Sequence, residues 1–184
     1  ILTSFYDATV EFKACPYPAA TNMETREVMI DRNTLLKVHR PADQVRMAKG
    51  LLYHESGHLF WSLDANGINA LRQFGQANGH GNNVKLLGCY NEIEDKRIEN
   101  HFVARYAPAK AYLAEPLSRI ILNRNLDTLS DTELAAVWMS AVGRPWLGAT
   151  AYNTLRSYVV HRLAQTANLT NVVSVSETLV RNYL

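Results

Sequence analysis

Two histidines four positions apart, with a glutamate directly after the first, have the clearest chemical potential in this chain. His54, Glu55 and His58 form a His-Glu-x-x-His motif. On a helix, side chains four positions apart lie on one face, so both imidazoles can bind the same Zn²⁺ ion. A glutamate beside the first histidine can reach a metal-bound water and accept its proton as a general base. The pattern therefore predicts a zinc site with Glu55 as the catalytic residue.

A catalytic zinc ion needs a third protein ligand, because such sites have three protein ligands and leave a fourth position open to water. In a helix predicted at residues 84–106, Glu94 and Asp95 lie on the apolar face, where an unpaired charge is costly. Glu94 is the first choice as third ligand and Asp95 is the alternative. The acid that does not bind the metal could orient a histidine. On a helical wheel of this segment, another side, predicted to face solvent, carries Glu92, Lys96 and Glu99.

The element that must position the motif is a long helix. Pro41 is followed by residues typical of a first helical turn, and no breaker interrupts the pattern before Asn66-Gly67. This predicts one helix over about residues 41–65. Apolar side chains occur on nearly every side of it, so we expect it to be buried in the core. Gly50 and Gly57 lie on one stripe of this helix, where another element can approach closely.

Two short segments before this helix have the pattern of strands. Val10 and Phe12 alternate with charged residues within 8–14, and a second short strand is predicted at 27–31. We expect these two segments to pair as a small antiparallel β-hairpin. The alternative is an irregular N-terminal arm.

The remaining chain is predicted to be helical apart from one loop. The Gly- and Asn-rich segment at 66–83 joins the two helices that carry the predicted ligands, and it is a candidate lid or a plain connector. Within it, a short helical piece is predicted around residues 68–74. A capping box of Ser130 and Glu133 opens one of the later helices. The helices predicted after the second key helix cover 109–124, 131–143, 149–167 and a last segment ending at Leu184. The fold class is therefore mainly α (α+β), in a single domain over residues 1–184.

Composition limits the classes of partner. The chain has 184 residues, 19 basic and 17 acidic, with a net charge of +2. Such a balance gives no electrostatic reason to expect nucleic acid or a membrane surface as partner. No apolar run approaches the roughly 20 residues of a membrane span, and no secretory signal opens the chain, so we expect a cytoplasmic protein. Because the first residue is Ile1, the chain is expected to be a fragment, a processed product or a chain with a missing start.

A resemblance to a known family extends the motif. In the segment 90–99, the residues Asn91, Glu94, Asp95, Arg97 and Glu99 are similar to the Asn-x-x-Glu-Asp-x-Arg-x-Glu signature that follows His-Glu-x-x-His in a group of phage and bacterial proteins. These are the cobaltochelatase-subunit-like proteins and predicted metallopeptidases. The resemblance covers about residues 15–105 and implies a zincin-like metallopeptidase fold with a Zn²⁺ cofactor. It also implies the cytoplasm of a bacterial host, if the protein is encoded by a phage.

The resemblance assigns roles by position. It implies His54, His58 and one acid of the Glu94-Asp95 pair as zinc ligands, with Glu55 as the base. Asn91-Glu92 is also similar to the Asn-Glu ligand motif of thermolysin-like enzymes. No aspartate follows four residues after Glu92, however, and the wheel turns Glu92 outward, so it ranks third.

The predicted function is that of a zinc-dependent metallopeptidase, an endopeptidase that hydrolyses peptide bonds of a protein or peptide substrate. The alternative is a metal-binding scaffold or interaction module of a chelatase-like or phage-encoded assembly, with little or no proteolysis. A third hypothesis is a helical structural protein with a chance motif, which predicts no stoichiometric zinc.

Overall fold

The computed structural model describes residues 7–77, 84–122, 125–147 and 149–163. Contacts within the chain group it into two compact units, Ile1–Pro116 and Leu117–Leu184. The single domain expected over residues 1–184 stays a prediction.

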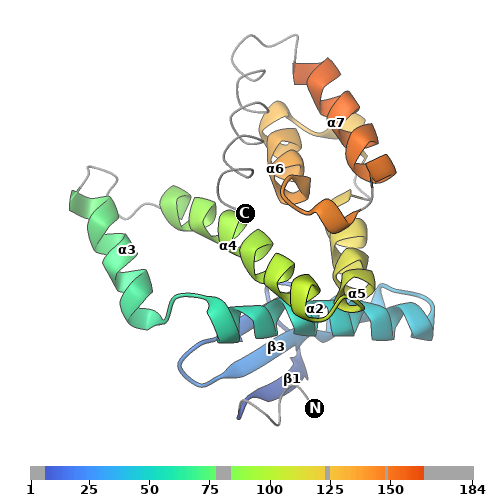
Figure 1. The fold of residues 1–184 in the computed structure, drawn as a ribbon. Helices are drawn as coiled ribbons and strands as arrows, with labels where there is room; N and C mark the ends of the chain where they lie inside the picture. Colours follow the sequence, from blue (N-terminus) through green and yellow to red (C-terminus); the bar gives the residue numbers. More distant parts are fainter. Residues whose placement is uncertain (1–6, 78–83, 123–124, 148, 164–184) are drawn as a thin grey trace. The chain divides into compact units, whose positions relative to one another are not determined.

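The first unit begins with a three-stranded sheet (Figure 1). Its strands are β1 (Thr9–Lys13), β2 (Ala19–Asn22) and β3 (Glu27–Asp31), and β3 lies in the centre. β2 pairs antiparallel with β3, whereas β1 pairs parallel with β3, with Val10 opposite Val28. The central strand thus has one neighbour of each orientation.

The predicted hairpin between residues 8–14 and 27–31 is therefore wrong in its pairing. The hairpin of this sheet is formed by β2 and β3, and Arg26 in the turn between them has a positive φ of 56°. β2 reads Ala-Ala-Thr-Asn, which has neither the apolar alternation nor the bulky side chains that mark a strand. Because this unrecognised strand reverses the chain once more, β1 and β3 run in the same direction.

The helices of the first unit follow the sheet. They are α1 (Arg32–Leu36), α2 (Pro41–Trp61), α3 (Ala65–Ala77), α4 (Val84–Arg105) and α5 (Ala109–Pro116). The predicted long helix is confirmed as α2, which begins at Pro41 and ends before Ser62, where the backbone is extended. The second key helix is confirmed as α4. α3 is longer than the short helical piece expected, and the rest of the Gly- and Asn-rich segment, 78–83, lies outside the described residues.

The core of this unit lies between the sheet and α2. Figure 1 shows α2 running along one side of the strands. The buried apolar residues that pack there are Val28, Ile30, Val38, Met47 and Leu51. Two glycines of α2 let other helices approach closely, as expected. A Cβ atom at Gly50 would lie 2.2 Å from the main-chain oxygen of Tyr112 in α5, and one at Gly57 would lie 3.1 Å from Cβ of Ile98 in α4.

The second unit is helical over its described residues. It contains the π-helical segment Leu117–Leu122, α6 (Asp131–Ala141) and α7 (Ala149–Leu163), with short 3₁₀ turns at Leu126–Thr128 and Pro145–Leu147. The capping box of Ser130 and Glu133 at the start of α6 is confirmed. Its core is a cluster of buried side chains: Leu129, Leu134, Val137, Trp138, Ala141, Val142, Leu155 and Val159. The helix predicted to end at Leu184 lies outside the described residues.

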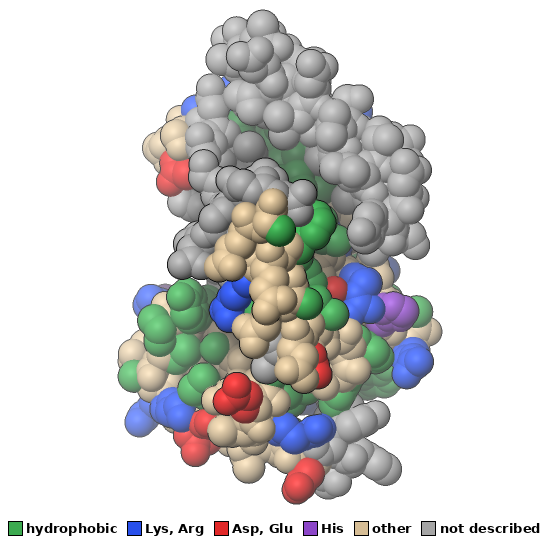
Figure 2. All heavy atoms as spheres, turned by 90° about the vertical axis from the view of Figure 1, so that its left-hand side faces the viewer, with side chains coloured by type: hydrophobic (Ala, Val, Ile, Leu, Met, Phe, Trp, Pro, Cys, Tyr) green, Lys and Arg blue, Asp and Glu red, His purple; other side chains and the backbone are tan. Residues whose placement is uncertain are grey.

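These elements confirm the mainly α (α+β) fold class. Within the described residues, no helix is both long and apolar enough to cross a membrane. Figure 2 shows acidic and basic side chains interspersed over the described part of one face, in keeping with the small net charge of +2.

Candidate metal centre

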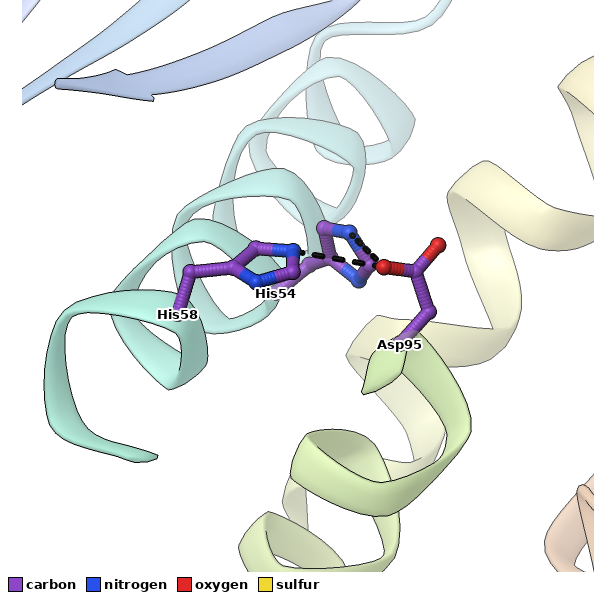
Figure 3. A group of neighbouring side chains, drawn as sticks. All are labelled: His54, His58 and Asp95. Carbon is purple, nitrogen blue, oxygen red and sulfur yellow. Dashed lines mark ion pairs between the residues drawn. The ribbon is translucent and has the colours of Figure 1, made fainter. Parts of the chain in front are cut away.

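Two histidines of α2 and an aspartate of α4 converge on one point (Figure 3). One ligand atom from each of His54, His58 and Asp95 lies within 4.8 Å of the other two. Oδ1 of Asp95 is 3.3 Å from Nε2 of His58 and 3.7 Å from Nε2 of His54. Tetrahedral zinc with bonds of 2.0–2.1 Å separates its ligand atoms by about 3.3 Å. The spacing of these atoms therefore suits a zinc ion placed between them.

The three side chains are neither fully buried nor freely exposed. Between 19% and 25% of the surface of each is accessible to solvent. A buried site would exclude a substrate, and a fully exposed one would hold its ligands loosely. Each of the three side chains therefore keeps part of its surface in contact with solvent.

Glu94, the first choice as third ligand, lies elsewhere. Its carboxylate accepts hydrogen bonds from Nε of Arg97 at 2.7 Å and from Nη2 of Arg97 at 2.6 Å, and only 5% of the residue is exposed. Asp95, the alternative, is the acid that the structure brings to the histidines. Consecutive helical residues point about 100° apart. The two acids therefore meet different neighbours: Glu94 is buried against Arg97, whereas the partly exposed Asp95 faces the histidines.

The burial of Glu99 and Lys96 contradicts the solvent-facing side that was predicted for α4. Both were expected on a solvent-facing side of α4, yet Glu99 is 6% exposed and Lys96 is 1% exposed. α4 is buried on more than one side, so a wheel with one solvated face does not describe it. Nδ1 of His54 donates to Oε1 of Glu99 at 2.8 Å. Glu99 lies one turn after Asp95, and this i, i+4 spacing is the signal that could have linked it to the site.

The acids around His54 make the site attractive to a cation. Burial alone would lower the pKa of His54, but the hydrogen bond to Glu99 and the charges of Asp95, Glu99 and Glu55 raise it to about 9. Burial acts to raise the pKa of Asp95, but the hydrogen bond to His58 and the nearby imidazoles hold it below its usual value. Asp95 and the imidazole of His54 each favour the charged form of the other, so the surroundings of His54 favour positive charge.

Glu55, the predicted base, is held between α2 and the sheet. It is 7% exposed, and Oγ1 of Thr21 donates to its Oε2 at 2.6 Å. The same hydroxyl lies 3.1 Å from the main-chain oxygen of Glu55. Thr21 belongs to the edge strand β2 and was not predicted. No local pattern could have found it, because the two residues are 34 positions apart.

Ser62 was missed as well. Its Oγ lies 2.8 Å from Nδ1 of His58, on the side of the ring opposite the Nε2 that faces Asp95. Ser62 follows the two histidines at the same spacing of four residues, which is the signal that a search of the sequence could have used. Glu92, the third-ranked ligand, is not one of the three converging residues; it pairs with Lys96 at 3.2 Å.

Comparison with known proteins adds nothing to this geometry. No protein-family model, curated protein or solved structure matches the chain. The candidate centre therefore rests on the positions of its own side chains. The resemblance of the 90–99 segment to the predicted metallopeptidases stays a prediction.

Proposed function

We propose that this protein is a zinc-dependent hydrolase of the metallopeptidase type. His54, His58 and Asp95 would hold the metal through two imidazole nitrogens and one carboxylate oxygen. The observation that carries the proposal is the convergence of these three ligand atoms within 4.8 Å. Glu55, which follows His54 directly in the chain, is the glutamate that the motif offers as base.

The donor set supports zinc. Imidazole and carboxylate are ligands that Zn²⁺ accepts, and three of them leave a position for water. Two histidines and one carboxylate also suit non-haem Fe(II). Glu55 favours zinc, because a carboxylate base next to a metal-bound water serves hydrolysis directly.

The roles of the chain's own residues follow from their contacts. When bound, zinc supplies a Lewis acid and lowers the pKa of its water toward neutrality. Glu55 would serve as the general base toward a water at the site and, once protonated, as the general acid toward the amine that leaves when the peptide C–N bond breaks. Thr21 holds one carboxylate oxygen of Glu55, which leaves the other for this transfer. Glu99 holds the ring of His54 from behind.

A protein or peptide as substrate comes from the resemblance to the predicted metallopeptidases. The same resemblance supports a phage-encoded protein working in the cytoplasm of a bacterial host. We propose both as parts of the same function.

The first experiment is elemental analysis of the purified chain. The parent is expected to hold one zinc per chain, and His58→Ala and Asp95→Asn are expected to lose it. Glu92→Gln is the matched control, since it removes one acid from α4 without touching the ligand group. A parent protein without stoichiometric metal would overturn the proposal and favour a helical protein with a chance motif.

The second experiment separates an enzyme from a scaffold. Glu55→Gln is expected to keep its zinc and to lose cleavage of an unfolded protein substrate such as casein. Zinc binding without turnover in the parent would favour the alternative, a metal-binding module of a chelatase-like or phage-encoded assembly. Cleavage by Glu55→Gln at the parent's rate would contradict the role of Glu55.

A further inference from the structure

The three ligand atoms of the candidate centre come from two different helices (Figure 3). His54 and His58 are four residues apart in α2, so the helix itself fixes the distance between their imidazoles. The position of Asp95 relative to them depends on how α4 packs against α2. The contacts between these two helices therefore decide whether the three ligand atoms converge.

An apolar contact limits how closely the two helices approach. A Cβ atom at Gly57 would lie 3.1 Å from Cβ of Ile98, so the backbone of α2 packs tightly against this side chain of α4. Apolar contacts have no preferred direction. They do not by themselves fix the register of one helix along the other, which needs a directional interaction such as a hydrogen bond.

Arg97 of α4 makes such a directional contact with the end of α2. Its Nη2 donates to the main-chain oxygen of Trp61 at 2.5 Å. Trp61 is the last residue of α2, and the last carbonyl groups of a helix have no partner within the helix. These carbonyls carry partial negative charge, and a guanidinium is a favourable partner for them. Because the donor belongs to another helix, the hydrogen bond also ties α2 to α4.

The guanidinium of Arg97 is held in place by a residue of its own helix. Its Nε and Nη2 donate to the two carboxylate oxygens of Glu94 at 2.7 Å and 2.6 Å. Nη2 has two hydrogens, so it can donate to Glu94 and to Trp61 at the same time. Arginine presents its donors in a rigid planar fork, whereas the ammonium of lysine has no fixed plane. The contact with α2 is therefore fixed in direction as well as in length.

Tyr90 makes a second contact between α4 and the chain just past the end of α2. Its hydroxyl oxygen accepts from the main-chain N–H of Leu63 at 3.2 Å. Tyr90 and Arg97 are seven residues apart, which places them on the same side of α4. Two directional contacts from this side thus hold the chain directly before and after Ser62, the residue that follows α2.

We propose that Arg97 is a positioning residue of the metal centre. It fixes the last turn of α2, which carries His58, against the turn of α4 that carries Asp95. His58 lies three residues before Trp61 in α2. Asp95 lies two residues before Arg97 in α4, so each ligand is within one helical turn of the hydrogen bond. The effect on metal binding rests on the proposed function, but the packing of the two helices is a property of the metal-free chain.

The zinc affinity of the full-length chain tests this role, because charge and position predict changes of opposite sign. Arg97→Gln removes a positive charge two residues from Asp95, which by charge alone would strengthen zinc binding. If Arg97 positions the ligands, the variant should instead bind zinc about 10-fold more weakly, at the lower end of the range for groups around metal ligands. Arg97→Lys keeps the charge and can still donate to one acceptor, so we expect a smaller loss.

Arg46→Gln is the matched control for these titrations. Arg46 is exposed in α2, so its substitution makes the same change of charge and should leave the zinc Kd at the parent's value. Competition with a chromophoric chelator measures each Kd at a temperature where every variant is folded. A purely structural role of Arg97 would lower the Tm of the metal-free chain and leave this Kd unchanged.

Proton NMR of the metal-free chain tests the packing of the helices without the metal. The rings of Trp61 in α2 and Phe102 in α4 meet edge to face with their centroids 5.4 Å apart, so the parent should show nuclear Overhauser effects between them. Arg97→Gln should weaken these effects, and Arg46→Gln should leave them unchanged. If Arg97→Gln does not fold, Arg97→Lys takes its place in both measurements.

The outcomes separate the two proposals. Zinc binding by Arg97→Gln and Arg97→Lys that is as tight as the parent's, or tighter, overturns the role of Arg97 in the metal centre. Parent-like Overhauser effects between Trp61 and Phe102 in both variants overturn it too. A parent that binds no zinc overturns the proposed function, and the spectra of the metal-free chain still decide whether Arg97 fixes the packing of α2 on α4.

Discussion

The substitution Glu99→Gln tests how strongly the surroundings of His54 act on the metal. The amide oxygen of glutamine can still accept from Nδ1 of His54, so the shape of the site is kept. The change removes the negative charge from a contact of 2.8 Å at a residue that is only 6% exposed. Carboxylates that orient metal-binding histidines contribute about 10- to 100-fold to metal affinity. We expect zinc binding to weaken by that factor.

The expected shift in thermal stability can be worked out from mass action. With free zinc at about 100 times the parent's Kd, binding stabilises the parent by about 2.7 kcal/mol. At the same zinc concentration, Glu99→Gln should gain only about 0.4–1.4 kcal/mol. For a chain of this size, 1 kcal/mol moves Tm by about 2–4 °C. The zinc-induced rise in Tm should therefore fall from about 5–11 °C in the parent to about 1–6 °C in the variant.

Calorimetry in metal-buffered solution, with and without zinc, measures both shifts. Glu24→Gln is a suitable control, because Glu24 is exposed in the turn after β2. His54→Ala marks the complete loss of the zinc-induced rise. If Glu99→Gln kept the parent's zinc affinity while His54→Ala lost it, the hydrogen bond to Glu99 would not orient a ligand.

Three further predictions concern activity and stability. Thr21→Val should lower kcat with KM and zinc content nearly unchanged, because the hydroxyl positions Glu55 and not the metal, and Thr21→Ser should recover much of the rate in a peptidase assay. Gly50→Ala should lower the free energy of unfolding, measured with denaturant, by about 3 kcal/mol or more, because the new Cβ would lie 2.2 Å from a main-chain oxygen. The better helix propensity of alanine returns only about 1 kcal/mol of this loss. Hydrogen bonds from Thr34 hold the pKa of Asp31 below its ordinary 3.8. The contribution of Asp31 to stability is therefore present above about pH 3.8 and is lost as the pH falls through the lower pKa of the folded state. Asp31→Asn should remove this acid-dependent step from melting temperatures measured over a pH series.

The sequence predicts the long elements of the site well. Helix α2 has a clear start at Pro41 and carries His54, Glu55 and His58 at a spacing that only a helix brings together. This information is local, because it depends on periodicity and on one proline in the first helical turn. α4 was found in the same way, together with its two inward acids.

The choice between the two acids could not be made from the sequence. Glu94 and Asp95 are neighbours on one helix, and both lie on the side of the predicted wheel that carries the apolar residues. What separates them is the crossing of α4 over α2 and the position of Arg97, which takes up the Glu94 carboxylate. Such a crossing depends on packing between distant segments, which no helical wheel contains.

The sheet shows the same limit. Strand β2 is short and built of small or polar residues, so its existence depends on pairing with β3 and not on its own pattern. Because β2 was missed, the pairing of β1 and β3 was predicted with the wrong direction. The contact between Thr21 and Glu55 was missed for the same reason.

The close approach of α2 and α4 at Gly57 bears on the size of the ion that the candidate centre can hold. This glycine lies inside the motif, one residue before His58. The atoms nearest to a Cβ placed on it belong to Ile98 of α4, three residues after Asp95. The distance between α2 and α4 at Gly57 and the distance between the Asp95 carboxylate and the imidazoles are therefore set by the same two helices. A methyl group at residue 57 would meet Ile98 at 3.1 Å and press the helices apart by a few tenths of an ångström. Larger divalent ions, with longer bonds to oxygen and nitrogen, would then gain in affinity relative to zinc.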